Sequence, residues 1–569
     1  MNQPRRSRLR YFPYLTMTVF LLPILVGLLF TWLPAFGYLP AIGADQFSLE
    51  PFVRLLDHPS LPGALRSTLF SAIAATLISL GLSLWLAITS YNSRLWRIVE
   101  ISMAPLLALP HAAFAVGFIF LIAPSGWLIR LVSPFPSGFD YPPGWITAGD
   151  PWAISLTLTM VCKETPFLLL MIFSGLNRLD VRRIIWVGRS LGYRRLRIWT
   201  RLIIPQLYPM LRLPVLAVLA YSLSVVDLAV IIGPSTPPTL SVLIDRWFNN
   251  ANLSSRLVGA AGAVLLLLLT LALIVGTLAA ERLIKRVGSA RILSGSRSSL
   301  LEPLVSTGPL CAVILLGINL LSLCALVLWS IARSWRFPDV LPDGFSLSAW
   351  SRTLEQLVQP LTTSALTALA SSLIAAVLVI GCFENERYLA RTRLPSISQR
   401  SLWIIYLPLL IPQIGFLFGI QLILITLHLE GRWISLIWIH LVFVLPYVFL
   451  TLANHYRSYD QRFSSVAVTL CNSELRSFFQ VKLIMLIKPV LFSLAVGFSV
   501  SIAQYLPTLY VGAGRFATMT TETVSIASGS DRRIIAVYAL GQFILPLCFY
   551  LAAILLPVTM FRNRTKMQN

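Results

Sequence analysis

The chain has 569 residues, of which 57% are hydrophobic and only 12% are charged, and its formal net charge is +23 at pH 7. Soluble domains carry about 25% charged residues, so this composition excludes an ordinary soluble protein and favours one surrounded by membrane lipid. The basic residues lie in short loops between apolar runs, which is a pattern of membrane topology, so nucleic acid is excluded as a partner despite the positive charge.

Apolar runs of about twenty residues predict twelve membrane-spanning helices, each long enough to cross a bilayer. We place these spans at residues 13–36, 66–91, 99–122, 151–176, 206–232, 257–281, 306–332, 360–383, 402–426, 433–453, 488–511 and 534–560. The expected fold class is therefore an all-α integral membrane protein. The first run lacks a small-residue cleavage site, so we expect it to remain as a span.

Basic residues gather in every second loop. Arginines and lysines precede the first span and follow the second, fourth, sixth, eighth, tenth and twelfth spans, from Arg5 and Arg6 at one end to Arg564 and Lys566 at the other. The intervening loops are acidic or balanced. Because positively charged loops stay on the cytoplasmic side, we expect both termini in the cytoplasm.

The second part of the chain repeats features of the first. Matching positions are Phe47-Ser48-Leu49 with Phe345-Ser346-Leu347, Pro110 and Gly117 with Pro412 and Gly419, and Pro166, Asp180 and Pro209 with Pro446, Asp460 and Pro489. Each repeat holds six spans and starts on the same side, which predicts two parallel six-helix repeats. We place the repeats at residues 1–290 and 306–569, joined by a Ser/Gly-rich cytoplasmic linker at 291–305.

The loop at residues 178–209 contains eight arginines, and Pro205 follows Gly192 by thirteen positions. A similar loop precedes the eleventh span. At an offset of 280 positions Gly192 pairs with Asn472, whereas a shift of one would pair it with Cys471. We prefer Asn472, because glycine and asparagine tolerate a left-handed backbone turn. Both loops then read as a short helix, a tight turn, a second helix and a proline opening the next span.

These loops resemble the EAA loop of type I ABC importer permeases, which serves as a coupling helix in a groove of a separate ATPase subunit. Gly192, Pro205 and Pro209 match the family pattern. The leading Glu-Ala-Ala does not match, because the first loop has Trp186-Val187-Gly188. The second loop has Met485 in place of the inner proline, and Glu474 is a candidate for the missing acid.

The resemblance implies a set of residues that couple the chain to its ATPase. They are Arg189, Gly192, Tyr193, Arg194, Pro205 and Pro209 in the first loop, and Cys471, Asn472, Glu474 and Pro489 in the second. The alternative for any single arginine is a topology signal alone.

The resemblance extends over nearly the whole chain. Two fused halves of this length are similar to permeases of the iron(III) and thiamine type, and three segments (163–167, 233–240 and 512–522) look most like an uncharacterised thiamine-like branch. The family implies two cytoplasmic ABC ATPase subunits, a periplasmic solute-binding protein and the bacterial inner membrane. A thiamine-like compound, iron(III) and other small cations remain open as the solute.

Polar residues within the spans are candidates for a translocation pathway, because such residues usually face a bundle interior or a water-filled path. They are His111 and its repeat partner Gln413, Glu164 in the fourth span, Asp227 in the fifth, and Gln504 and Tyr505 in the eleventh. The alternatives are hydrogen bonds between helices and, for Lys163 and Glu164, ion pairs with other spans. Two acids on a pathway would suit a cationic solute.

Common motifs of ATP binding and metal binding are missing from the sequence. It has no G-x-x-x-x-G-K-[ST], H-E-x-x-H or C-x-x-C, and its six cysteines lack paired spacing. We therefore expect a transport subunit without its own ATPase, catalytic or metal site, and without a cofactor. Two rival functions stay open. One is a secondary transporter driven by an ion gradient, in which Glu164 and Asp227 carry protons, and the other is a membrane scaffold that transports nothing.

Overall fold

The computed structural model describes residues 8–292, 297, 299, 301–391, 402–529 and 531–560. These residues form helices and connecting loops, with isolated bridges but no strand among them, which confirms the all-α fold class. Six of the fifteen residues of the predicted linker (293–296, 298 and 300) and the basic residues at both termini (Arg5, Arg6, Arg564 and Lys566) lie outside the described residues. We call residues 8–292 the first half and residues 301–560 the second half.

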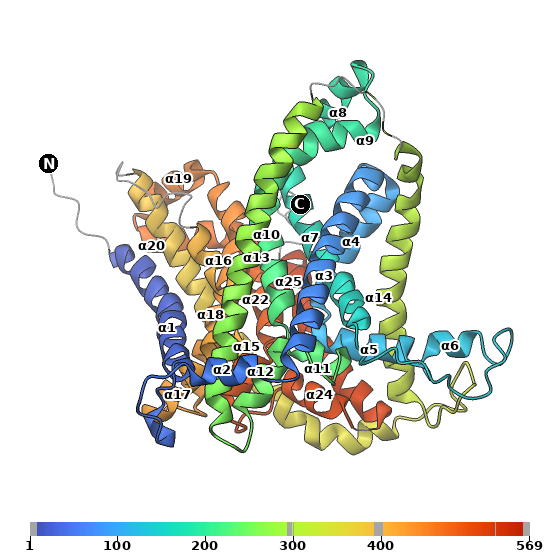
Figure 1. The fold of residues 1–569 in the computed structure, drawn as a ribbon. Coiled ribbons are helices and arrows are strands. Elements are labelled where there is room, and N and C mark those ends of the chain that lie inside the picture. Colours follow the sequence, from blue (N-terminus) through green and yellow to red (C-terminus); the bar gives the residue numbers. More distant parts are fainter. Residues whose placement is uncertain are drawn as a thin grey trace.

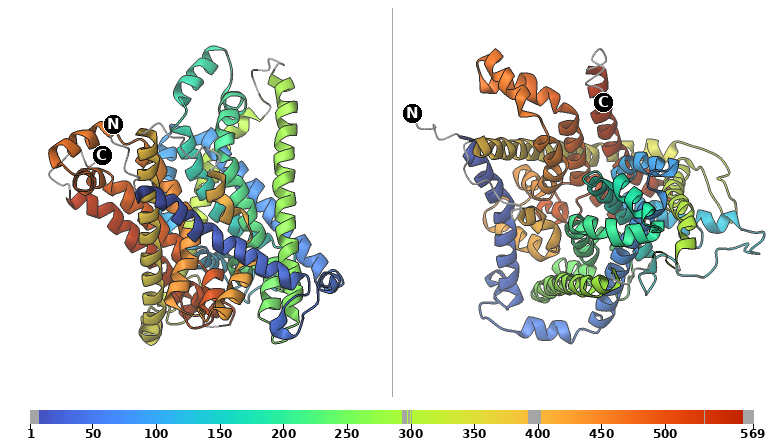
Figure 2. Two further views of the ribbon diagram at one scale, coloured as in Figure 1. Left: turned by 90° about the vertical axis from the view of Figure 1, so that its left-hand side faces the viewer. Right: turned by 90° about the horizontal axis from the view of Figure 1, so that it is seen from above.

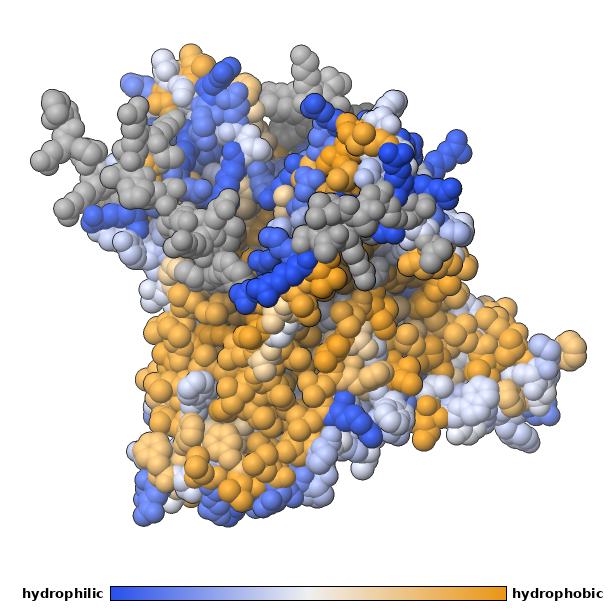
Figure 3. All heavy atoms as spheres, turned by 45° about the horizontal axis from the view of Figure 1, so that its top comes forward, coloured by the Kyte–Doolittle hydropathy of each residue, from blue (hydrophilic) through white to orange (hydrophobic). Residues whose placement is uncertain are grey.

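Ten helical segments in the described residues are long and apolar enough to cross a membrane. Their helices are α1 (Tyr11–Ala35), α3 (Leu61–Ser90), α5 with α6 (His111–Ile122 and Trp127–Leu131), α7 (Ile154–Leu176), α10 (Ile204–Ser224), α13 (Ser255–Ile292), α14 (Gly308–Ile331), α15 (Ser348–Arg391), α18 (Trp433–Arg457) and α25 (Arg532–Met560). An eleventh span is bent by 75° where α22 (Ile487–Ile502) begins. On the face shown in Figure 3 a broad hydrophobic band lies below hydrophilic residues, as expected for a protein in a bilayer.

Several of the twelve predicted spans are interrupted in the structure. The expected third span is broken into α4 (Arg94–Ala108) and α5, and the expected ninth into α16 (Leu402–Leu410) and α17 (Ile414–Thr426). Pro110 and Pro412 lie at these two breaks, and a proline removes a backbone donor and clashes with the preceding turn. The fifth and eleventh spans also end early, before α11 (Asp227–Ile232) and α23 (Leu506–Gly512).

The packing of the first half recurs in the second half. Helix α7 packs against α3 and α10, and α18 packs in the same way against α15 and α22. Two short helices, α12 (Leu240–Phe248) and α24 (Met519–Ala527), pack against α13 and α25 respectively. The same pairs of elements thus build both halves, in agreement with the matching sequence positions.

The first helix of each half packs mainly on the other half. Helix α1 lies along α17 and α14 lies along α5, at opposite edges of the molecule (Figures 1 and 2). A Cβ atom on Gly117 of α5 would lie 2.6 Å from the carbonyl oxygen of Ser322 on α14. A Cβ atom on Gly419 of α17 would likewise overlap the backbone of Gly27 on α1. The N–H of Gly419 donates to Oγ1 of Thr31 at 3.0 Å. Small residues therefore permit both exchanged contacts.

Candidate functional site

The first loop forms the helix–turn–helix that the sequence predicts. The carboxylate of Asp180 accepts a hydrogen bond from the backbone N–H of Arg183 and so caps α8 (Val181–Ser190). Gly192 then turns the chain with φ of +81°, a left-handed conformation that favours glycine. A short helix, α9 (Arg195–Ile198), and one π-helical turn lead directly into α10. A Cβ on Gly188 would lie 2.7 Å from Ile198, so α8 and α9 are tightly packed.

The second loop has the same plan. Asp460 caps α19 (Gln461–Cys471), and α20 (Glu474–Ser477) follows the turn. The left-handed residue is Asn472, with φ of +48°, while Cys471 is the last residue of α19. The turn therefore falls where the pairing of Gly192 with Asn472 places it. Both loops lie at the same end of the bundle (Figure 1).

The two loops join their spans differently. Pro205 and Pro209 lie in the first turns of α10, which continues from α9 as one segment from Arg195 to Ser224. In the second loop a short helix, α21 (Leu483–Met485), is followed by the 75° bend, and Pro489 is the third residue of α22. Met485 thus ends a helix at the bend, whereas Pro205, its counterpart, lies in an unbroken segment.

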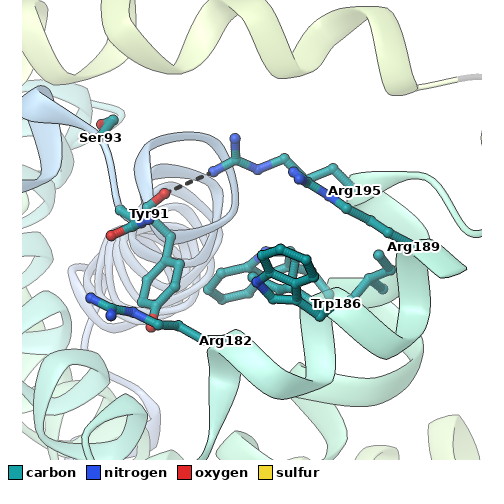
Figure 4. A pocket seen from close by; sticks show the side chains of 10 residues that line it. Tyr91, Ser93, Arg182, Trp186, Arg189 and Arg195 are labelled. Carbon is teal, nitrogen blue, oxygen red and sulfur yellow. Dashed lines mark hydrogen bonds between the residues drawn. The ribbon is translucent and has the colours of Figure 1, made fainter.

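An arginine-lined cavity of about 310 Å³ lies between the first loop and the turn that connects α3 to α4 (Figure 4). Its lining residues are Tyr91, Asn92, Ser93, Arg182, Ile185, Trp186, Arg189, Arg195, Ile198 and Trp199. Arg195 holds the two sides together, because its Nη2 donates to the carbonyl oxygen of Tyr91 at 3.4 Å. Of the predicted coupling residues, Arg189 lines this cavity.

The corresponding place in the second half is nearly filled. A cavity of about 70 Å³ remains between the end of α15 and the second loop, and Glu474 is one of its lining residues. The ammonium group of Lys482, which is 1% exposed, forms an ion pair with Glu384 of α15. The hydroxyl of Tyr456 also donates to Glu384. A buried ion pair therefore lines the smaller cavity.

Residues of the linker touch the first loop. The backbone N–H of Arg194, at the start of α9, donates to the carbonyl oxygen of Arg297 at 3.1 Å. The next turn is capped by Glu302, whose Oε1 accepts from the N–H of Leu196 at 3.2 Å. Tyr193 bonds instead within the loop, with its N–H donating to the carbonyl oxygen of Gly188. The connection between the halves thus helps to hold α9 in place.

A second group of polar residues lies within the membrane-spanning part, at the breaks in the helices. His111 is the first residue of α5, and its Nε2 lies 3.4 Å from Oε1 of Glu164 on α7. The ring of Tyr221 on α10 lies 5.3 Å from the ring of His111. Asp227, the first residue of α11, interacts electrostatically with His111. The two helix breaks thus place Glu164 against the imidazole of His111 and Asp227 within electrostatic range of it, and we call these four residues the central cluster.

Lys163 forms no ion pair with another span among the described residues, so that alternative is wrong for it. Its ammonium group donates to the carbonyl oxygens of Leu106 and Leu109, at 2.9 and 2.6 Å. These carbonyls lie at the end of α4, where Pro110 interrupts the helix and leaves acceptors without their usual donors. Lys163 therefore caps a broken helix, and it is Glu164 that pairs with a residue from another span.

The second half contributes tyrosines to the central cluster. Tyr447 of α18 interacts electrostatically with Glu164, and Tyr505, at the break before α23, with Asp227. Among the described residues, the side chains of Gln413 and Gln504 make no hydrogen bond to the cluster, so the structure does not bring them to it. Tyr221 and Tyr447 were not predicted, because an aromatic residue in an apolar run is indistinguishable from a core residue.

Comparison with known proteins places these features in context. The chain matches no known family profile. It is 32% identical over 516 residues to the inner membrane ABC transporter permease protein YnjC of Escherichia coli (strain K12). The match covers 89% of this chain and 90% of that protein, so it includes both loops and the central cluster.

Proposed function

Because the chain belongs to the family of inner membrane ABC transporter permeases, we propose that it is the fused permease subunit of a binding-protein-dependent importer. Separate cytoplasmic ATPase subunits would hydrolyse ATP, and a periplasmic binding protein would deliver a small solute. Residues 1–290 and 306–569 would be its two permease repeats, joined by the linker at 291–305. Both termini and both loops would then lie in the cytoplasm.

The observation that carries this proposal is the pair of helix–turn–helix loops at one end of the bundle. Each is capped by an aspartate and turned by a left-handed residue, Gly192 or Asn472. Each also exposes large apolar side chains outside the spans, of which Trp186 and Leu470 are 78% and 80% exposed. Exposed apolar groups of this size favour a protein partner.

The continuity of α9 with α10 supports a mechanical role for the first loop. A displacement of α9 would pass along α10 to the break at residues 225–226, where Asp227 begins α11. Asp227 belongs to the central cluster, which includes residues of α5, α7 and α18. Movement of the loop would therefore change the packing between the halves, which is how alternating access arises in transporters with paired repeats.

The charges of the central cluster support a cationic solute. Glu164 and Asp227 are two carboxylates within the spans, whereas the positive charge of Lys163 is directed at the carbonyls of α4. Tyr221, Tyr447 and Tyr505 each interact electrostatically with one or both of these acids, and tyrosine rings can attract cations. The proposal therefore keeps small cations, including a thiamine-like compound and iron(III), as the class of solute.

The test is to purify the intact chain with the ATPase subunit that accompanies it and to reconstitute the pair in liposomes. We expect ATP-driven uptake, and we expect co-purification to be lost in a Gly192→Val and Asn472→Val double variant, because β-branched residues are strained at positive φ. Gly81→Ala is the control, because a Cβ there meets no neighbour within 4 Å. Uptake by the chain alone, driven by an ion gradient, would instead establish a secondary transporter.

A further inference from the structure

The arginine-lined cavity beside the first loop presents hydrogen-bond donors from several directions. Arg182 and Arg189 come from α8 and Arg195 from α9, and all three line a single hollow (Figure 4). Trp199 also lines it, and the indole N–H of this fully buried side chain has no hydrogen-bond partner among the described residues. An unpartnered buried donor beside three guanidinium groups indicates that an acceptor with negative charge belongs there.

The positive charge of the cavity is not balanced by its own lining, which contains no carboxylate. None of the ion pairs among the described residues involves Arg182, Arg189 or Arg195. Asp180 caps α8, and Glu302 caps α9 and also interacts electrostatically with Arg195, which leaves Arg182 and Arg189 without an ion-pair partner among the described residues. A carboxylate from outside the chain would supply the missing charge.

The rim of the cavity distinguishes a protein partner from a free anion. Trp186, Val187 and Leu191 are 78%, 50% and 56% exposed, and they lie on or next to α8 beyond the hydrophobic band. A small anion would gain nothing from these apolar side chains. A protein that covers them would remove them from water and would place its own side chains over the cavity.

We propose that the cavity receives the carboxylate of an aspartate or glutamate of the ATPase subunit, held by Arg182, Arg189 and Arg195. This inference rests on the proposed function, because it requires that an ATPase docks on the first loop. Charge at this contact is then reversed from the family pattern described above, in which the loop itself carries the leading acid.

The second loop cannot make the same contact. The counterpart of Arg182 is Arg462, but that of Arg189 is Thr469. The smaller cavity beside it is lined by the ion-paired Lys482 and Glu384 and by an acid of the loop itself, Glu474. One side of the ATPase pair would therefore bind through a buried charge pair, and the other through apolar side chains such as Leu470.

The first experiment is charge reversal in the complex of the full chain with its ATPase. We expect Arg182→Glu with Arg189→Glu to weaken ATPase binding about tenfold or more, since truncating or reversing a buried charge contact raises dissociation. Arg183→Glu with Arg462→Glu is the matched control, because it makes the same charge change on two exposed residues that line neither cavity. Binding within twofold of the unaltered chain in the double variant of Arg182 and Arg189 would overturn the proposal.

The second experiment identifies the carboxylate. An Arg189→Lys variant offers an amine, which a carbodiimide joins directly to a carboxylate in contact with it. We expect a covalent link to one acid of the ATPase, located by mass spectrometry, and none from an Arg183→Lys variant. Equal linking at both positions would contradict a specific contact.

Two further outcomes separate this inference from its alternatives. One outcome is that inorganic phosphate or vesicles of anionic lipid stabilise the chain alone, and that Arg182→Glu with Arg189→Glu abolishes this stabilisation but leaves ATPase binding normal. The cavity is then an anion or lipid site, and the inference is wrong. If no ATPase accompanies the unaltered chain, the proposed function fails first. The inference alone fails if the ATPase binds the unaltered chain and the charge-reversed double variant equally well.

Discussion

Gly419 is the residue at which a helix from each half comes into backbone contact. Any side chain there would meet the backbone of Gly27 on α1 and disturb the hydrogen bond to Thr31. We expect Gly419→Ala to lower stability by about 1–3 kcal/mol, because atoms added to a packed contact force the helices apart. The midpoint of thermal unfolding of the purified chain in detergent measures this loss of stability. Gly276→Ala, at an open position on α13, is expected to leave the midpoint unchanged.

Glu164 is the residue that joins the two halves within the central cluster. Replacing it by glutamine keeps the shape and removes the charge that faces His111 and Tyr447. We expect Glu164→Gln to reduce solute uptake at least about tenfold while ATPase binding is retained, because the cluster is remote from the loops. Uptake in liposomes and co-purification are the two readouts. Normal uptake by Glu164→Gln would exclude a charge-dependent pathway at this residue. The control is Glu100→Gln, which removes the same charge from an exposed position on α4.

Single residues also decide how much of the site can be predicted from sequence. Gly192 and Asn472 were predictable, because the left-handed turn is a property of the residue itself. The arginine-lined cavity was not, since it requires Tyr91 to meet α8 across about ninety positions of chain, and no local pattern encodes that approach. Lys163 illustrates a third case, in which the residue was recognised but its partner was a backbone carbonyl exposed by a helix break.

At the scale of elements, the two loops differ in how they are fastened. The first continues straight into α10 and is held by Arg297 and Glu302 of the linker, whereas the second meets α22 through a 75° bend. A straight connection transmits displacement better than a bent one. The first loop is therefore expected to be the stronger coupling element.

Separate loop variants test this asymmetry. We expect Gly192→Val to reduce the stimulation of ATPase activity by solute-loaded binding protein several-fold more than Asn472→Val does. Both substitutions place the same β-branched side chain at a positive φ, so they match in kind. Equal losses in the two variants would indicate that the bend has no mechanical consequence.

Elements also explain why the continuity of the spans was overestimated. Hydrophobicity locates apolar runs well, and each of the twelve predicted runs is helical over most of its described length. Continuity is a different property, because Pro110 and Pro412 interrupt runs that remain apolar on both sides. The break at residues 225–226 has no proline in it or just after it, whereas the break at 503–505 is followed by Pro507, which cannot donate to the carbonyl oxygen of Ala503.

At the scale of the whole molecule, the exchange of α1 and α14 ties the halves together. Each half completes its packing only with a helix from the other half, so neither is expected to be stable alone. We expect residues 1–290 and 306–569, produced separately, to aggregate or be degraded. Produced together in one cell, they should form a complex that survives purification. Size-exclusion chromatography in detergent distinguishes these results, and a stable monomeric half would show that the exchange is dispensable.

The same exchange sets an order of events during synthesis. Helix α1 ends at Ala35, but the helix it packs against, α17, begins at Ile414. At a rate of about 5–20 residues per second, the ribosome needs roughly 20 to 80 seconds to make the intervening chain. During that interval the groove around Gly27 and Thr31 faces lipid or a chaperone instead of its partner. The first span of the nascent protein therefore has to make temporary contacts before its native ones. Its final assembly begins only when nearly three quarters of the chain has been translated.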